Sequence, residues 1–235
     1  MPESTRIHYQ EELKRLEDRA LEGLDMVNNT LKRAVEACEN QDVELAEMVI
    51  ADDDRIDGRY LEIHQSILAL LARQAPVATD LRLISALLHL IRHVERMGDQ
   101  CVNIAKVIPI TGHDAPHHDE MLTRISKMGE QVGVQISQAK QAFALRDVGL
   151  AEDLVRQDDV VDQLNRECFN VALDVGESRD IREWAMTMLL VARALERIGD
   201  NAVDIGEQVE FIVTGLFREF EDASHPGQVA PSQAP

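Results

Sequence analysis

The chain has 235 residues, with 43 acidic side chains against 24 Lys and Arg, a formal net charge of −19, and 45% hydrophobic but only 3% aromatic residues. A surface field this negative repels nucleic acid and anionic lipid and favours basic partners or metal cations. Abundant aliphatic side chains with few aromatics are typical of helix packing, so we expect an all-α protein.

Helical periodicity runs through most of the sequence, and turn-rich breaks divide it into six predicted helices. The breaks fall near residues 39–42, 73–80, 108–119, 144–149 and 174–180. The central break is rich in Pro and Gly and separates residues 1–112 from residues 113–221. Each half is expected to be an antiparallel three-helix bundle with helices of roughly 30 residues. Residues 222–235 are predicted to be a disordered tail.

From the sequence we expect neither a targeting segment nor a membrane-spanning one. The N-terminal sequence lacks the apolar stretch of a signal peptide, and no run approaches the roughly 20 apolar residues that span a bilayer. The three cysteines, Cys38, Cys101 and Cys168, lack C-x-x-C spacing and indicate neither a disulfide framework nor a thiolate metal site. We therefore expect a cytoplasmic protein in a reducing compartment.

The two halves repeat each other. The phrase ERMGDQCVNI at residues 95–104 returns as ERIGDNAVDI at residues 196–205, and seven of thirteen positions from residue 92 are identical after a shift of 101. A shift of 105 superposes acids of the second helices: Asp42 on Asp147, Asp53 on Asp158, Asp54 on Asp159 and Asp57 on Asp162. Self-similarity of this kind indicates an internal duplication.

The repeated phrase combines an apolar seam with acids. The seam advances by three or four residues, as expected for a helix that faces a bundle core. It comprises Leu87, Leu90, Val94, Met97, Cys101, Ile104 and Ile108 in the third helix, and Met188, Val191, Leu195, Ile198, Ala202, Ile205 and Val209 in the sixth. Between the seam residues lie row one, which is Glu95, Asp99 and Asn103, and row two, which is Glu196, Asp200 and Asp204. We expect both rows to face away from the core.

Each row is a line of oxygen ligands about 12 Å long on one helix face, because residues four apart advance by only about 40° around the helix. Oxygen donors without Cys or an obligatory His suit Mg²⁺, Mn²⁺ or iron better than structural Zn²⁺ or copper. Bridging carboxylates would allow a row to hold a small multinuclear cluster.

The same residues also permit a purely structural interpretation. Arg92 precedes Glu95 by three residues and Arg96 precedes Asp99 by three, so the acids can form intrahelical ion pairs worth ~0.3 kcal/mol each. Such pairs give no role to Gly98, which costs roughly 1 kcal/mol in a helix and indicates close approach of another helix. The second half offers the same pairs and the same glycine, so the residues alone leave both interpretations open.

The two phrases resemble the paired E/D-x-x-x-D-x-x-x-N/D motifs of PhoU, the phosphate-specific transport accessory and regulatory family, over residues 7–220. The resemblance implies two similar three-helix bundles with metal clusters of Mg, Mn, Fe or Zn ions on row one and row two. Row one ends in Asn103 where row two ends in Asp204, so its cluster would be less negative. Acids of the second helices resemble additional ligands of the family: Asp54, Asp57, Asp159 and Asp162.

The resemblance also implies a function. Members of the family are negative regulators of the phosphate-starvation response and of phosphate uptake rather than enzymes. They link the ATPase subunit of a phosphate ABC transporter to a membrane sensor histidine kinase, so this chain would meet the membrane only through partners. A homodimer is expected, and no nucleic acid partner.

Two alternatives compete with this expectation. A metal-free helical adaptor would use the acids to bind a basic partner. A di-iron carboxylate protein would need Glu-x-x-His on inward-facing helices, and none of the eight histidines follows a Glu by three residues. His89 and His93 lie one turn apart, but their repeat counterparts are Leu190 and Ala194, so we expect packing or surface roles for both. No P-loop, nucleophile elbow or metalloprotease motif is present, which argues against an enzyme.

Overall fold

The computed structural model describes residues 3–74, 76–111 and 116–220, and all regular structure in these ranges is helical. The helices are α1 (Glu3–Asn40), α2 (Val43–Ala51), α3 (Asp53–Arg73), α4 (Ala78–Thr111), α5 (Asp119–Leu145), α6 (Val148–Asp174) and α7 (Arg179–Thr214). The predicted all-α class is confirmed, with α2 and α3 together forming the predicted second helix. The predicted boundary at 112/113 and the predicted tail, 222–235, lie outside the described residues.

The second helix of the first half is interrupted at Asp52, the first of three consecutive aspartates. Aspartate is a poor helix former, and neighbouring carboxylates repel each other. Arg33 of α1 holds the interrupting side chain, with its Nη1 2.6 Å from Asp52 Oδ2. The equivalent residue of the second half is the neutral Gln157, which donates to Gln138 Oε1 at 2.6 Å, and α6 runs without a break.

The turn between the first and second helices of each half has the same construction. Gln41 and Arg146, which are 105 residues apart, both adopt the left-handed region, with φ of 52° and 58°. The next residues, Asp42 and Asp147, cap the following helices by accepting hydrogen bonds from the amide three residues on, at 2.9 and 3.1 Å. The duplication read from the sequence therefore extends to the backbone.

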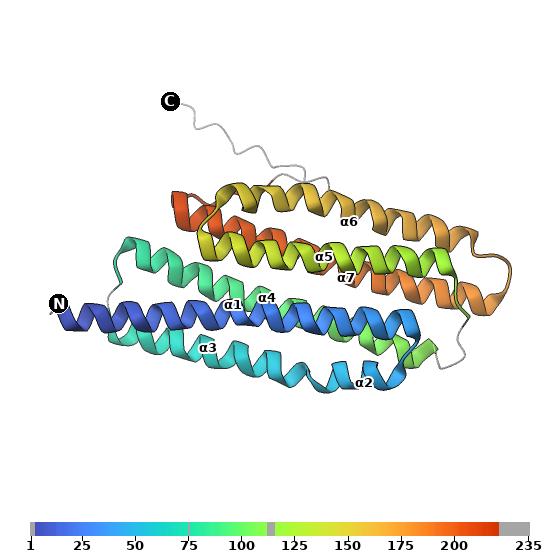
Figure 1. Ribbon diagram of the computed structural model, residues 1–235, viewed down its shortest axis with the longest axis horizontal. Coiled ribbons are helices and arrows are strands. Elements are labelled where there is room, and N and C mark those ends of the chain that lie inside the picture. Colours follow the sequence, from blue (N-terminus) through green and yellow to red (C-terminus); the bar gives the residue numbers. More distant parts are fainter. Residues whose placement is uncertain (1–2, 75, 112–115, 221–235) are drawn as a thin grey trace, which may run out of the picture.

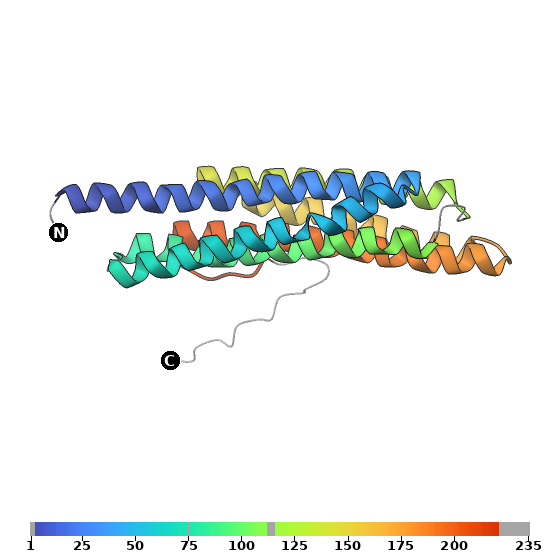
Figure 2. The ribbon, with the colours of Figure 1, turned by 90° about the horizontal axis from the view of Figure 1, so that it is seen from below.

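The two bundles lie lengthwise beside each other (Figure 1), with α1 to α4 in one and α5 to α7 in the other. Helices α4 and α7 pack in antiparallel directions, and α1 packs against α5. Figure 2 shows α1 and α5 in one layer and α4 and α7 in the layer beneath. None of the described helices is long and apolar enough to cross a bilayer.

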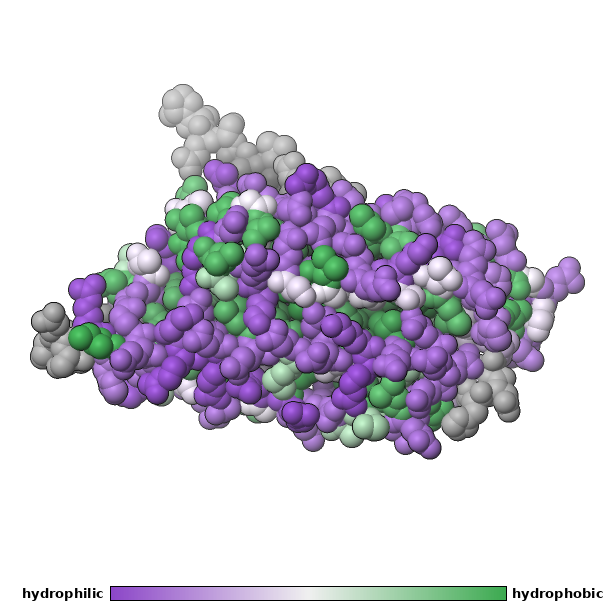
Figure 3. All heavy atoms as spheres, in the orientation of Figure 1, coloured by the Kyte–Doolittle hydropathy of each residue, from purple (hydrophilic) through white to green (hydrophobic). Residues whose placement is uncertain are grey.

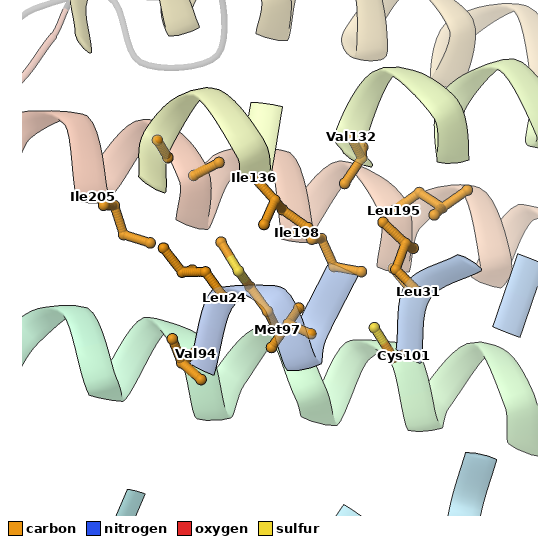
Figure 4. Close-up of a cluster of buried hydrophobic side chains, with 14 of the residues drawn as sticks. Leu24, Leu31, Val94, Met97, Cys101, Val132, Ile136, Leu195, Ile198 and Ile205 are labelled. Carbon is orange, nitrogen blue, oxygen red and sulfur yellow. The ribbon is translucent and has the colours of Figure 1, made fainter. Parts of the chain in front are cut away.

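The bundles share one hydrophobic core. In Figure 4, side chains from α1, α4, α5 and α7 point toward one another, including Leu24, Met97, Ile136 and Ile198. Every residue of the two predicted seams is at most 3% exposed, so the seam prediction is confirmed. Each seam thus packs against the other half as well as its own, which leaves only the flanks of α4 and α7 for the acids.

Polar and hydrophobic residues are both exposed on the surface. Figure 3 shows hydrophilic residues over most of one face, with hydrophobic residues visible in the band between α1 and α5. A groove of about 620 Å³ runs between these helices, with Val35 on the α1 side and Gly129 and Gly133 on the α5 side. A Cβ on Gly129 would lie 2.7 Å from Val35 Cγ2 and one on Gly133 3.1 Å from Asn28 Oδ1, so both glycines allow α1 and α5 to approach each other closely.

Candidate metal centre

Row one meets acids from a second helix. Glu95 is partly buried on α4, Asp99 is exposed, and α3 brings Asp53 and Asp57 against them. Burial raises the pKa of Glu95, an effect that Arg92 opposes and the charges of Asp99 and Asp57 reinforce. Burial likewise raises the pKa of Asp53, again with help from Asp57 and Asp99. These four carboxyl groups therefore form one patch with excess negative charge.

The basic side chains near this patch do not pair with all of its carboxylate oxygens. Arg92 Nη1 lies 3.0 Å from Glu95 Oε1, and Lys106 is close enough to lower the pKa of Asp53. Glu95 Oε2 is buried and has no hydrogen-bond partner among the described residues. A buried carboxylate oxygen without a donor is costly, so this atom is suited to accept a cation.

Row two is buried to a larger extent than row one, and Glu196 in particular is not the outward, solvent-facing residue that we expected. Glu196 is only 7% exposed, Asp200 is partly buried, and Asp162 of α6 is 6% exposed. Burial raises the pKa of Asp200 to about 6, and the charges of Glu196 and Asp162 contribute. Burial also raises the pKa of Glu196, although Arg193 opposes the shift. The uninterrupted α6 lies over this side of α7, where the sequence suggested open solvent.

A buried polar pair extends row two into the bundle. Asp158 of α6 is 2% exposed, and its Oδ1 accepts a hydrogen bond from Gln135 Nε2 at 3.0 Å. A Cβ on Gly199 would lie 2.7 Å from that same Oδ1. In the first half, a Cβ on Gly98 would lie 3.0 Å from Ile56 Cδ1 of α3. The expected close approach of another helix at both glycines is therefore confirmed. In the second half, the space beside Gly199 is occupied by the Asp158 carboxylate.

Two of the four second-helix acids expected at the rows lie beside them, and two do not. Asp54 and Asp159 are exposed, whereas Asp57 and Asp162 lie close enough to act on the pKa of row residues. Two further acids that the sequence prediction omitted lie close by: Asp53 near Asp99 of row one, and Asp158 against Gly199, the neighbour of Asp200 in row two. Helical phase could have found them, because each lies four residues before Asp57 or Asp162 and hence on the same face.

The third members of the rows differ. Asn103 is exposed and its Nδ2 donates to Gln100 Oε1 of the same helix at 3.4 Å, so the structure does not bring it to the acids. The charge of Asp204 contributes to the raised pKa of Asp200, and Asp204 also approaches His93 of α4. Asp204, the third residue of row two, therefore interacts with the other acids of its row, whereas Asn103 of row one does not.

Both patches offer carboxylate oxygens, the ligands that suit hard cations, but their side chains are not already arranged around a common metal position. Among the described residues, no three His, Cys, Asp or Glu side chains are arranged to hold a metal ion. Burial raises the pKa of the Cys38 and Cys101 thiols to about 12, which leaves carboxylates as the anionic donors. A divalent cation would relieve the repulsion that raises these carboxyl pKa values. Arg193 contacts both carboxylate oxygens of Glu196 and would have to swing away for a cation to bind there, whereas Arg92 contacts only Oε1 of Glu95 and leaves Oε2 available.

Neutralising Asp200 is expected to stabilise the metal-free protein. Because the pKa of Asp200 is raised on folding, its proton favours the folded state at low pH, and stability is lost as the pH rises through about 6. With an allowance for solvent screening, Asp200→Asn should add about 1 kcal/mol at pH 7.5 in chelator. The gain over wild type should vanish near pH 4 in urea unfolding. The exposed Asp159→Asn is the matched control, and an equal gain in that variant would contradict the electrostatic assignment.

Comparison with known proteins decides the family. Residues 21–108 and 125–209 each match the family model described as PhoU domain. The chain belongs to the PhoU family. It is 33% identical over 220 residues to the phosphate-specific transport system accessory protein PhoU homolog of Clostridium acetobutylicum, which covers 93% of this chain and 100% of that protein. Identity to PhoU homolog 1 of Mycobacterium leprae is also 33%, over 94% of this chain and 99% of that protein.

Solved PhoU structures have the same fold. The crystal structure of PhoU from Pseudomonas aeruginosa matches with a TM-score of 0.80 at 29% identity, over 88% of this chain and 100% of that one. The phosphate transport system regulatory protein PhoU from Streptococcus pneumoniae matches with a TM-score of 0.79 at 26% identity, over 89% and 99%. The two predicted PhoU repeats and the role as a phosphate transport regulatory protein are thereby confirmed.

Proposed function

We propose that this chain is a negative regulator of the phosphate-starvation response and of phosphate uptake, and that it acts as a metal-binding adaptor. Its partners are the ATPase subunit of a phosphate ABC transporter and a sensor histidine kinase. The observation that carries the proposal is the near full-length match to phosphate-specific transport accessory proteins. In this account the protein is a cytoplasmic homodimer without a catalytic site, and reaches the membrane only through its partners.

The metal part of the proposal is supported by the two acidic patches. Each patch combines acids from two helices, and in each the pKa of two carboxyl groups is raised by burial and by neighbouring carboxylates: Asp53 and Glu95 in the first, Glu196 and Asp200 in the second. Residues that would hold hard cations such as Mg²⁺, Mn²⁺ or iron are Asp53, Asp57, Glu95 and Asp99 in the first repeat and Asp158, Asp162, Glu196, Asp200 and Asp204 in the second. A bound cation would supply fixed positive charge there and hold the paired helices together.

Charge complementarity supports an adaptor role. A rigid helical body with a formal net charge of −19 offers long acidic faces that steer and orient a basic partner surface. Cation binding would neutralise part of such a face, and the partners would then meet a different surface. Metal occupancy thus provides a physical route by which the adaptor could alter its contacts.

A metal-free adaptor is the second candidate, and the ion pairs favour it. Glu95 and Glu196 are already paired with Arg92 and Arg193, which gives the acids a structural role without any ion. The two candidates differ in one respect that can be measured, because only the first requires the protein to retain metal.

Deleting this protein from its host is expected to raise phosphate-starvation gene expression in phosphate-rich medium, because the repressing link between transporter and kinase is lost. The measurement is reporter expression together with phosphate uptake. Wild-type complementation should restore repression, and Asp99→Ala with Asp200→Ala should restore it only partly if metal is needed. Unchanged expression and uptake in the deletion strain would count against the regulatory role.

A further inference from the structure

Helix α4 carries a buried histidine where it packs against α7. His93 is 7% exposed, and its Nδ1 lies 2.8 Å from Asn201 Oδ1 and 3.5 Å from Asp204 Oδ2. Asp204 is the third acid of row two, while His93 belongs to the first repeat. A side chain of one repeat therefore lies against a row residue of the other.

The hydrogen-bond chain around His93 has a defined direction. Asn201 Nδ2 donates to Arg197 O at 2.6 Å, so Asn201 presents its Oδ1 as the acceptor. The proton between the two residues is hence assigned to His93 Nδ1, which donates to Asn201 Oδ1. The same His93 Nδ1–H group lies 3.5 Å from Asp204 Oδ2, so it attracts this carboxylate oxygen toward α4 electrostatically.

The repeat-related pair of positions lacks both members of this contact. The shift of 101 that superposes the two phrases places Ala194 at the position of His93 and Asn103 at the position of Asp204. Ala194 has no polar group to offer, and Asn103 instead bonds along its own helix to Gln100. The histidine and the charged third acid therefore occur together, and only on the side of row two.

We propose that His93 is a positioning residue for row two, so that the metal site of the second repeat is completed by a side chain from the first. This inference rests on the proposed metal binding. Polar groups that hold a ligating side chain in place commonly change metal affinity by about 10- to 100-fold when they are removed. His93 lies two residues before Glu95 on α4, so the contact also ties the helix of row one to row two.

The test is a titration with Mn²⁺ alone by calorimetry, in an Asp99→Ala background that removes row one. His93→Leu should raise the dissociation constant of the remaining site about tenfold, whereas His93→Gln, which keeps a donor, should recover most of that loss. His89→Leu is the matched control, because His89 is exposed one turn earlier and contacts Phe217. Its affinity should equal that of the background protein.

A double-mutant cycle with Asp204→Asn separates positioning from general destabilisation. If His93 acts through Asp204, His93→Leu should have little further effect on affinity once Asp204 is Asn. A full tenfold loss in that background would overturn the inference, as would unchanged affinity of folded His93→Leu or a tenfold loss of affinity in folded His93→Gln. Failure of wild type and of the Asp99→Ala protein to bind Mn²⁺ would instead overturn the proposed metal binding on which the inference depends.

Discussion

Arg193→Met is expected to destabilise the metal-free protein and to strengthen metal binding. Arg193 pairs with Glu196, whose side chain is buried beside Asp162 and Asp200. Removing one partner of a fully buried pair costs about 3–5 kcal/mol, and the exposed guanidinium of Arg193 reduces this to about 1–2 kcal/mol at pH 7.5. The loss has a clear cause, because Glu196 then lies among like charges without its countercharge.

Metal should reverse this loss. A cation at row two would replace the missing guanidinium and would no longer compete with it for Glu196, so the affinity for Mn²⁺ should rise in Arg193→Met. The measurement is thermal unfolding in chelator and in excess Mn²⁺. Arg179→Met removes an exposed i,i+4 pair with Glu183 and should leave both unfolding temperatures essentially unchanged. A variant that is destabilised equally with and without Mn²⁺ would show that Arg193 has only a structural role.

Gly129→Val is expected to destabilise the protein by about 2–3 kcal/mol through overpacking between the two halves. A Cβ on Gly129 would lie 2.7 Å from Val35 Cγ2 and 3.1 Å from Val35 Cγ1 across the α1–α5 contact. Valine 35 is branched at Cβ and stiff in a helix, so it cannot turn aside cheaply. Neighbouring contacts hold the two helices in register, among them Lys140 with Asp25 at 2.7 Å and Arg146 with Glu17 at 2.8 Å.

Urea unfolding with two further variants identifies the cause of the loss. Gly58→Ala is the control, because a Cβ there meets nothing within 4 Å and alanine should stabilise α3 by up to about 1 kcal/mol. Adding Val35→Ala to Gly129→Val should recover part of the lost stability. If the second substitution gives no recovery, the steric explanation fails.

The sequence predicted the fold well because its signals are local and repeated. Helical phase identified both seams, and the shift of 105 paired Asp42 with Asp147, which the structure then shows as equivalent helix caps. The break at Asp52 was missed, since its cause includes Arg33 on another helix. Interactions across helices cannot be read from periodicity within one helix.

The candidate site was predicted less completely for the same reason. Heptad counting placed Glu196 outside the seam but could not show that α6 covers it. Asp53 and Asp158 were passed over, although their spacing to Asp57 and Asp162 marks a shared face. The contact of His93 with Asp204 joins the two repeats and has no counterpart elsewhere in the duplication. Comparison of His93 with its repeat counterpart Ala194 therefore argued against a role for this histidine at the site.

The most direct test of the proposed metal centre is elemental analysis of protein purified without chelator, comparing wild type with the Asp99→Ala, Asp200→Ala double variant. The account predicts that wild type retains Mg, Mn, Fe or Zn and that the double variant loses most of it while keeping its helical content by circular dichroism. Equal metal in both proteins would remove the two rows from the site, and wild type that stays metal-free after reconstitution with Mn²⁺ would contradict metal binding itself.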